Sequence, residues 1–162
     1  MALAIGSTLT VSRLSRAQVN GVNPAPGMPE PSMVPTNGIN MAVYEKGSGP
    51  AVIFCHGFPE LAYSWRNQLG AIADAGYHAI APDQRGFGMT GGPQDSMQYD
   101  ISIFCFCDDV VGMMDAKGMD QTVFVGHDRG GAVALASSGS TRLRPDPQTC
   151  HLVMTPNLMI LL

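Results

Sequence analysis

The fold of this chain is decided by one stretch, Val123-Phe124-Val125-Gly126-His127-Asp128-Arg129-Gly130-Gly131-Ala132-Val133-Ala134. It opens with an apolar run short enough for a buried strand and continues, from Ala132, with residues typical of a helix. The glycines between the two parts allow a strand to pass into a helix with almost no loop, because side chains there would clash. Asp128 is then left at the tip of the turn.

Two interpretations of Asp128 follow from this pattern. Aspartate is a favoured helix N-cap, so a strand, turn and helix with Asp at the cap occur in many folds that make no chemical use of it. Alternatively, the turn is a nucleophile elbow, with Asp in place of the more common Ser of Gly-x-Ser-x-Gly. The stretch alone does not decide between them, so other loops have to.

The composition predicts one globular domain without a cofactor. The chain has 162 residues, 45% of them hydrophobic and 14% charged, which is enough for a sizeable core. The net charge of −4 and the scattered basic residues argue against nucleic-acid binding. No apolar run approaches the ~18 residues of a membrane span. The four cysteines lack paired spacing, so free thiols in a soluble, cytoplasmic protein are expected.

Residues 1–32 are expected to be a poorly ordered leader, because prolines and glycines crowd its last part. An organelle presequence is the alternative interpretation, since Arg13 and Arg16 are present and no acidic residue occurs before Glu30. The remaining residues, 33–162, are assigned to one core domain.

Hydrophobic patterning predicts an α/β fold for this domain. A hairpin is expected over residues 33–46, with Asn37-Gly38 as its turn. Buried-type apolar runs and helical periods then alternate along the chain. They predict strands and helices in the order 51–55, 62–75, 78–82, 101–117 and 121–125. Such alternation predicts a mostly parallel sheet with helices on both faces.

Active sites of such sheets lie beyond the carboxyl ends of the strands, where three unusual loops are expected to meet. The first is His56-Gly57-Phe58-Pro59, in which Gly57 permits a sharp turn and Pro59 restricts the next φ. The N–H of Phe58 can then point towards the elbow and form an oxyanion hole with the N–H of Arg129. An ordinary strand-to-helix turn is the alternative.

The second loop is Asp83-Gln84-Arg85-Gly86-Phe87-Gly88-Met89-Thr90. Its glycines suit a tight turn that Asp83 and Arg85 hold by hydrogen bonds. The loop contains Gly-x-Gly without the rest of a phosphate-binding pattern, so no nucleotide site is predicted. No metal site is predicted either.

Together, the three loops and Ser64-Trp65-Arg66 closely resemble the α/β-hydrolase superfamily. The narrower resemblance, over about residues 33–138, is to the branch with an aspartate nucleophile, which contains epoxide hydrolases and haloalkane or haloacetate dehalogenases. It implies that Asp128 is the catalytic nucleophile and that the backbone N–H groups of Phe58 and Arg129 form the oxyanion hole. The resemblance also implies that five further residues shape the site, namely His56, Gly57, Pro59, Gly126 and Gly130.

An aspartate nucleophile restricts the reaction on chemical grounds. A carboxylate attacks esters and amides poorly, but it can displace epoxide oxygen or halide from an sp³ carbon of a small molecule. The product is an alkyl-enzyme ester, which water hydrolyses through a tetrahedral oxyanion. That second step requires an oxyanion hole and a general base.

The resemblance implies that the base is a C-terminal histidine supported by an acid, and that cap-domain tyrosines activate the epoxide. None of the four histidines is expected to be this base. His56 belongs to the loop of residues 56–59. The side chain of His127 is expected to point away from the site, and His78 enters a strand remote from the loops. His151 adjoins a segment resembling the strand that follows the elbow helix. The chain is therefore expected to be a partial core without cap or C-terminal strands, whose open sheet edge favours self-association.

Three functions remain open at this point. Phe58-Pro59-Glu60-Leu61 and Ser64-Trp65-Arg66 favour an epoxide hydrolase. Arg129 after the nucleophile favours a haloacetate dehalogenase, in which Arg binds the substrate carboxylate, although the second Arg of that group falls at Ala132. The third is a non-catalytic fragment that binds a partner through its sheet edge.

Overall fold

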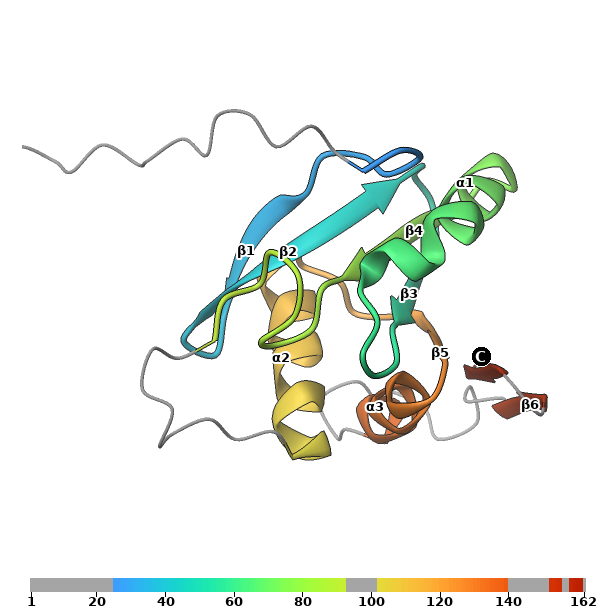
Figure 1. Ribbon diagram of the computed structural model, residues 1–162. Coiled ribbons are helices and arrows are strands. Elements are labelled where there is room, and N and C mark those ends of the chain that lie inside the picture. Colours follow the sequence, from blue (N-terminus) through green and yellow to red (C-terminus); the bar gives the residue numbers. More distant parts are fainter. Residues whose placement is uncertain (1–24, 93–101, 140–151, 156–157, 162) are drawn as a thin grey trace, which may run out of the picture.

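The computed structural model describes residues 25–92, 102–139, 152–155 and 158–161, the last two ranges as backbone only (Figure 1). Strands and helices alternate along these ranges after an opening hairpin. In chain order they are β1 Ser32–Thr36, β2 Ile39–Lys46, β3 Ala51–Cys55, the 3₁₀ turn η1 Ala62–Trp65, α1 Arg66–Asp74, β4 His78–Pro82, α2 Ile103–Ala116, β5 Val123–Gly126, α3 Arg129–Ser138, β6 Leu152–Thr155 and β7 Leu158–Leu161.

The strands form one sheet in the order β1-β2-β4-β3-β5-β7-β6. The central strand β3 pairs in parallel with both β4 and β5, with Val52 opposite Ala79 on one side and Val123 on the other. The predicted hairpin and the three adjacent parallel strands are therefore confirmed. β2 pairs antiparallel with β1 and β4. The described sheet is thus mixed, and it is parallel only across its centre rather than mostly parallel.

The C-terminal strands differ from the expected single strand after the elbow helix. β6 and β7 form an antiparallel hairpin, and β7 pairs antiparallel with β5. Only two residues connect them, and so short a connection joins antiparallel strands, whereas a parallel pair needs a long crossover. Self-association through the β6 edge stays a prediction.

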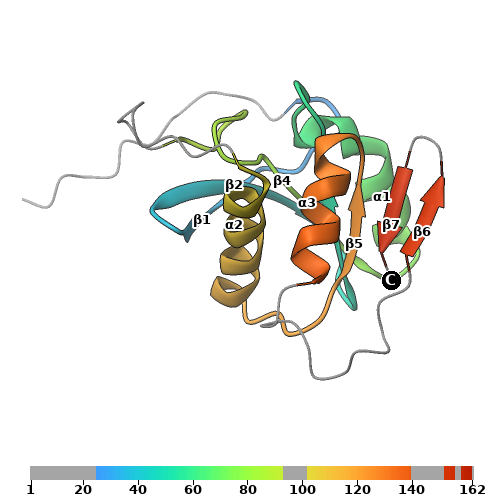
Figure 2. The ribbon, with the colours of Figure 1, turned by 90° about the horizontal axis from the view of Figure 1, so that it is seen from below.

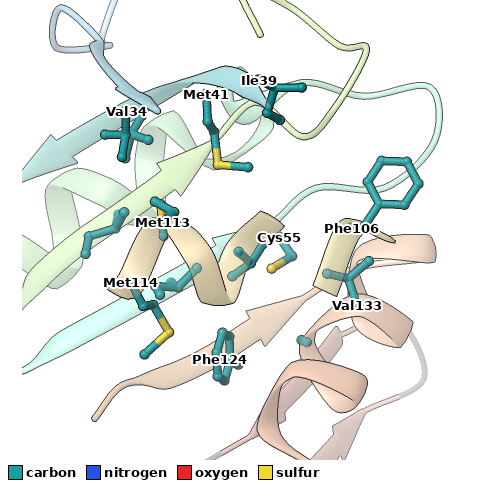
Figure 3. Close-up of a cluster of buried hydrophobic side chains, with 14 residues drawn as sticks. Val34, Ile39, Met41, Cys55, Phe106, Met113, Met114, Phe124 and Val133 are labelled. Carbon is teal, nitrogen blue, oxygen red and sulfur yellow. The ribbon is translucent and has the colours of Figure 1, made fainter. Parts of the chain in front are cut away.

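Helices cover both faces of the sheet, as expected. Side chains alternate along β3, so Ile53 and Cys55 pack into a cluster with α2 and α3, whereas Val52 and Phe54 pack with α1. Figure 2 shows α2 and α3 side by side on one face, with α1 on the other. The larger cluster lies between the sheet and α2 and α3 (Figure 3). Two packed layers thereby hold the carboxyl ends of β3, β4 and β5 in fixed positions.

The packed part of the chain begins slightly before residue 33. Met28 is buried in the cluster that α1 covers. Residues 1–24 lie outside the described ranges, so the leader and presequence interpretations stay predictions. Among the described residues, no helix combines the length and apolarity that crossing a membrane requires.

A buried ion pair fixes the loop after β4. Arg85 donates from Nε to Asp109 Oδ2 at 2.7 Å and from Nη2 to Asp109 Oδ1 at 2.6 Å. Arg85 Nη2 also donates to the Asn37 carbonyl at 3.2 Å, and Thr36 Oγ1 donates to the Asp109 carbonyl at 3.1 Å. The pair therefore joins the first hairpin, this loop and α2.

Replacing Asp109 is expected to test this junction. Asp109→Ala should lower the free energy of unfolding by about 3–5 kcal/mol, because the Arg85 charge stays buried without this carboxylate. Lys117→Ala is the control, since it removes a more exposed ion pair with Glu45 and should cost less than about 1 kcal/mol. Urea denaturation followed by circular dichroism measures both. Equal losses in the two variants would contradict the junction.

Candidate active site

Asp128 adopts a strained backbone at the turn between β5 and α3. Its φ is 53° and its ψ is −126°, a conformation that residues other than glycine rarely adopt. Asp128 occupies the N-cap position of α3, but its side chain makes no capping hydrogen bond. The N-cap interpretation of this carboxylate therefore fails, and the elbow geometry is the one observed.

Close backbone contacts explain the glycines of the turn. A Cβ on Gly126 would collide with the Gly130 carbonyl, and a Cβ on Gly130 would collide with the Cys55 carbonyl at the end of β3. A Cβ on Gly57 would lie 2.8 Å from the Asp128 Cβ and 3.1 Å from its Oδ2. These three glycines thus let the elbow, β3 and the loop of residues 56–59 approach one another.

The loop of residues 56–59, named the oxyanion loop for its expected role, contacts Asp128 directly. The Phe58 N–H donates to Asp128 Oδ2 at 2.9 Å, across 70 residues of sequence. The Arg129 N–H makes a second backbone hydrogen bond to the same carboxylate. The predicted placement of both N–H groups beside Asp128 is confirmed. The loop itself turns through a Glu60 N–H to Gly57 carbonyl bond of 3.1 Å and a cis Phe58–Pro59 peptide bond.

These hydrogen bonds set the charge of the exposed carboxylate. The Phe58 N–H, followed by the Arg129 N–H, holds the pKa of Asp128 below its usual value, and the nearby Arg129 guanidinium acts in the same direction. Asp128 is therefore ionised at neutral pH. An ionised carboxylate on a strained turn is chemically suited to act as a nucleophile.

His56 links the oxyanion loop to the loop after β4. It is fully buried, and its Nε2 accepts the Gln84 N–H at 3.0 Å. The proton is therefore on Nδ1, which donates to the Gly57 carbonyl at 2.9 Å. Burial is the main cause that lowers the pKa of His56, so the ring is neutral. Both ring nitrogens of His56 are thus engaged, and its role in supporting the site stays a prediction.

Two other histidines lie near carboxylates other than that of Asp128. His127 Nδ1 lies 3.6 Å from Glu60 Oε2, and His78 Nε2 lies 2.9 Å from Glu45 Oε2 at the opposite end of β4. His151 lies outside the described residues. Within the described ranges, no group of three or more His, Cys, Asp and Glu side chains is arranged to hold a metal ion.

One further feature of the site escaped sequence reasoning. The Arg129 guanidinium lies over the rings of Phe58, Phe87 and Phe106, at 5.4, 4.7 and 4.6 Å from their centroids. By contrast, the Cys55 thiol, directly before His56, is free and buried as expected, and burial raises its pKa to about 12. The three phenylalanines stand in separate segments, so no local pattern connects them.

A strained aspartate between a parallel strand and a helix, with two N–H donors on its carboxylate, defines an elbow of the α/β-hydrolase type. The family model described as alpha/beta hydrolase fold matches residues 50–146, and the chain belongs to this family. The resemblance inferred from the motifs is thereby confirmed.

Several similar proteins are named epoxide hydrolases. Epoxide hydrolase A of Mycobacterium tuberculosis is 50% identical over 109 residues, which are 66% of this chain and 33% of that protein. Epoxide hydrolase 2 of Siraitia grosvenorii is 51% identical over 65% of this chain and 33% of that protein. A crystal structure of an epoxide hydrolase from Vigna radiata matches with a TM-score of 0.62 and 43% identity, over 68% of this chain and 35% of that chain. The chain thus spans about a third of the length of these relatives.

Gly57→Ala is expected to disturb the site and the fold together. The new Cβ would collide with the Asp128 side chain, and such overpacking costs about 1–3 kcal/mol of unfolding free energy. Gly70→Ala in α1 is the matched control, because its nearest atom is 3.8 Å away and alanine favours a helix by about 1 kcal/mol. Thermal unfolding compares the two. A Gly57→Ala variant as stable as the wild type would refute the close approach.

Acidification is expected to remove a stabilising contribution of Asp128. A carboxyl whose pKa is lower in the folded state stabilises the fold above the unfolded pKa of about 4, and this contribution is lost as pH falls through the folded value. The difference in Tm between the wild type and Asp128→Asn should therefore shrink on acidification below about pH 4. Asp74→Asn, at the far end of α1, controls for the loss of one surface charge. A difference that is independent of pH would contradict the assignment.

Proposed function

We propose that this chain carries the nucleophilic half of an epoxide hydrolase site, with Asp128 attacking an epoxide carbon of a small molecule. The observation that carries the proposal is the hydrogen bond from the Phe58 N–H to Asp128 Oδ2, which holds an ionised carboxylate at the elbow. The similarity to epoxide hydrolases at 43–51% identity supports the choice of substrate.

The first step forms an ester. The Asp128 carboxylate attacks one epoxide carbon, the carbon–oxygen bond breaks, and the epoxide oxygen leaves with the electron pair and takes a proton from water. Oδ2, which accepts the Phe58 N–H, becomes the carbonyl oxygen of the alkyl ester. Alignment by the strained turn lowers the barrier, because the nucleophile needs little reorientation.

The second step is hydrolysis of that ester. Water adds to its carbonyl carbon, and negative charge develops on Oδ2, where the N–H groups of Phe58 and Arg129 stabilise it. Collapse of this intermediate releases a diol and restores the Asp128 carboxylate. Water needs a general base for the attack, and His56 does not supply it, since its Nε2 accepts the Gln84 N–H.

A haloacetate dehalogenase is the second candidate, because Arg129 follows the nucleophile. Two observations weigh against it. The Nε and Nη2 atoms of Arg129 are buried, and residue 132, where that group has a second Arg, is alanine. A carboxylate-bearing substrate would then lack the pair of guanidinium groups that bind it.

Incubation with styrene oxide is expected to alkylate Asp128 once. The described residues supply the nucleophile and the oxyanion donors but no general base, and lack of a base slows release by about 10²–10⁴-fold. Intact mass spectrometry should therefore show one stoichiometric adduct, and peptide mapping should place it on Asp128. Asp128→Asn should show none.

Cys105→Ser controls for alkylation of the partly exposed Cys105 thiol and should keep the adduct. Repeated turnover to diol would show that the chain supplies a general base. An adduct that persists in Asp128→Asn would overturn the assignment of the nucleophile.

A further inference from the structure

The Arg129 side chain lies among three phenyl rings from different segments. Phe58 belongs to the oxyanion loop, Phe87 to the loop after β4, and Phe106 to α2. All three centroids lie within 5.4 Å of the guanidinium carbon. A planar guanidinium over aromatic faces at this distance is attracted by the negative potential of the rings.

The three rings differ in how firmly the rest of the fold holds them. Phe106 is 1% exposed and belongs to the core cluster, where Figure 3 shows it near Val133. Phe58 is 63% exposed and packs edge-on against Phe87, with centroids 6.1 Å apart. Arg129 therefore connects an exposed ring of the oxyanion loop to a ring that the core holds.

Phe87 extends the same cluster to His56. Its ring meets the His56 imidazole at 5.4 Å between centroids and at an interplanar angle of 68°. His56 in turn donates to the Gly57 carbonyl, one residue before the Phe58 N–H. Both the side chain of Phe58 and the backbone that precedes it are thus fixed by contacts that include Arg129 or Phe87.

We propose that Arg129 is a positioning residue: its guanidinium holds the Phe58 and Phe87 rings and so keeps the Phe58 N–H directed at Asp128, instead of binding a substrate carboxylate. The inference rests on the proposed function of Asp128 and assigns its substrate class as uncharged epoxides. Burial of Nε and Nη2 supports it, because a substrate carboxylate would need these nitrogens for a two-point contact.

Hydrogen exchange of the Phe58 amide tests the positioning role without any substrate. Arg129→Met replaces the guanidinium with an apolar side chain of similar length. Phe87→Leu keeps the Arg129 charge and removes one ring. Both should speed exchange of the Phe58 amide by about tenfold or more, because the hydrogen bond to Asp128 opens more often. Arg66→Met is the matched control, since Arg66 stacks on the single exposed ring of Tyr63 at 4.5 Å, and it should leave the exchange unchanged.

Alkylation by two probes separates positioning from carboxylate binding. The rate constants for styrene oxide and for chloroacetate should change in Arg129→Met by the same factor. The pH midpoint of alkylation should move upward, because the Phe58 N–H bond to Asp128 opens more often and a nearby positive charge is lost. If Arg129→Met does not fold, Arg129→Lys and Phe87→Leu undergo the same two measurements.

Unchanged exchange of the Phe58 amide in the variants would overturn the inference, as would a loss specific to chloroacetate. The outcome for the proposed function is separate. If wild-type Asp128 is not alkylated while the amide exchange responds as expected, the proposed function fails and the positioning role of Arg129 stands.

Discussion

The hydrogen bond between the Phe58 N–H and the Asp128 carboxylate joins two loops that are 70 residues apart in sequence. The bond forms only because β3 and β5 are adjacent and parallel, so that both loops leave the sheet at the same edge. It also requires the carboxylate to stand clear of α3, which the positive φ of Asp128 provides. A strained φ of this kind costs on the order of 1–3 kcal/mol, which the surrounding contacts must offset.

Those contacts lie in two layers around the bond. The inner layer is backbone: Gly126, Gly130 and the Cys55 carbonyl pack so closely that no side chain fits between them. The outer layer is formed by side chains of the loop after β4, whose position depends on the buried Arg85–Asp109 pair. Gln84 and Phe87 of that loop contact His56, so the ion pair acts on the site through the loop.

Local sequence signals predicted the frame of this arrangement well. Apolar runs identified β3 and β5, Asn37-Gly38 identified the first hairpin, and the glycines around Asp128 identified the elbow. The contacts that sequence reasoning missed join distant residues. Asp109 is 24 residues from Arg85 and lies in an apolar helix. No periodic signal in that helix indicates that Arg85 pairs with Asp109 and not with its neighbour Asp83. The Arg129 cluster and the antiparallel β6–β7 hairpin likewise depend on tertiary placement that hydrophobic periodicity does not encode.

The burial of Cys55 has a consequence for chemoselectivity. Thiolates react with epoxides and alkyl halides more readily than carboxylates do, and Cys55 directly precedes the oxyanion loop. With a pKa of about 12 its thiol is almost wholly protonated at neutral pH, and it is shielded from solvent. The fold therefore keeps the Cys55 thiol protonated and buried, whereas the carboxylate of Asp128 is ionised and exposed. Of these two groups, only the carboxylate of Asp128 can be reached by an electrophile in its reactive, ionised form.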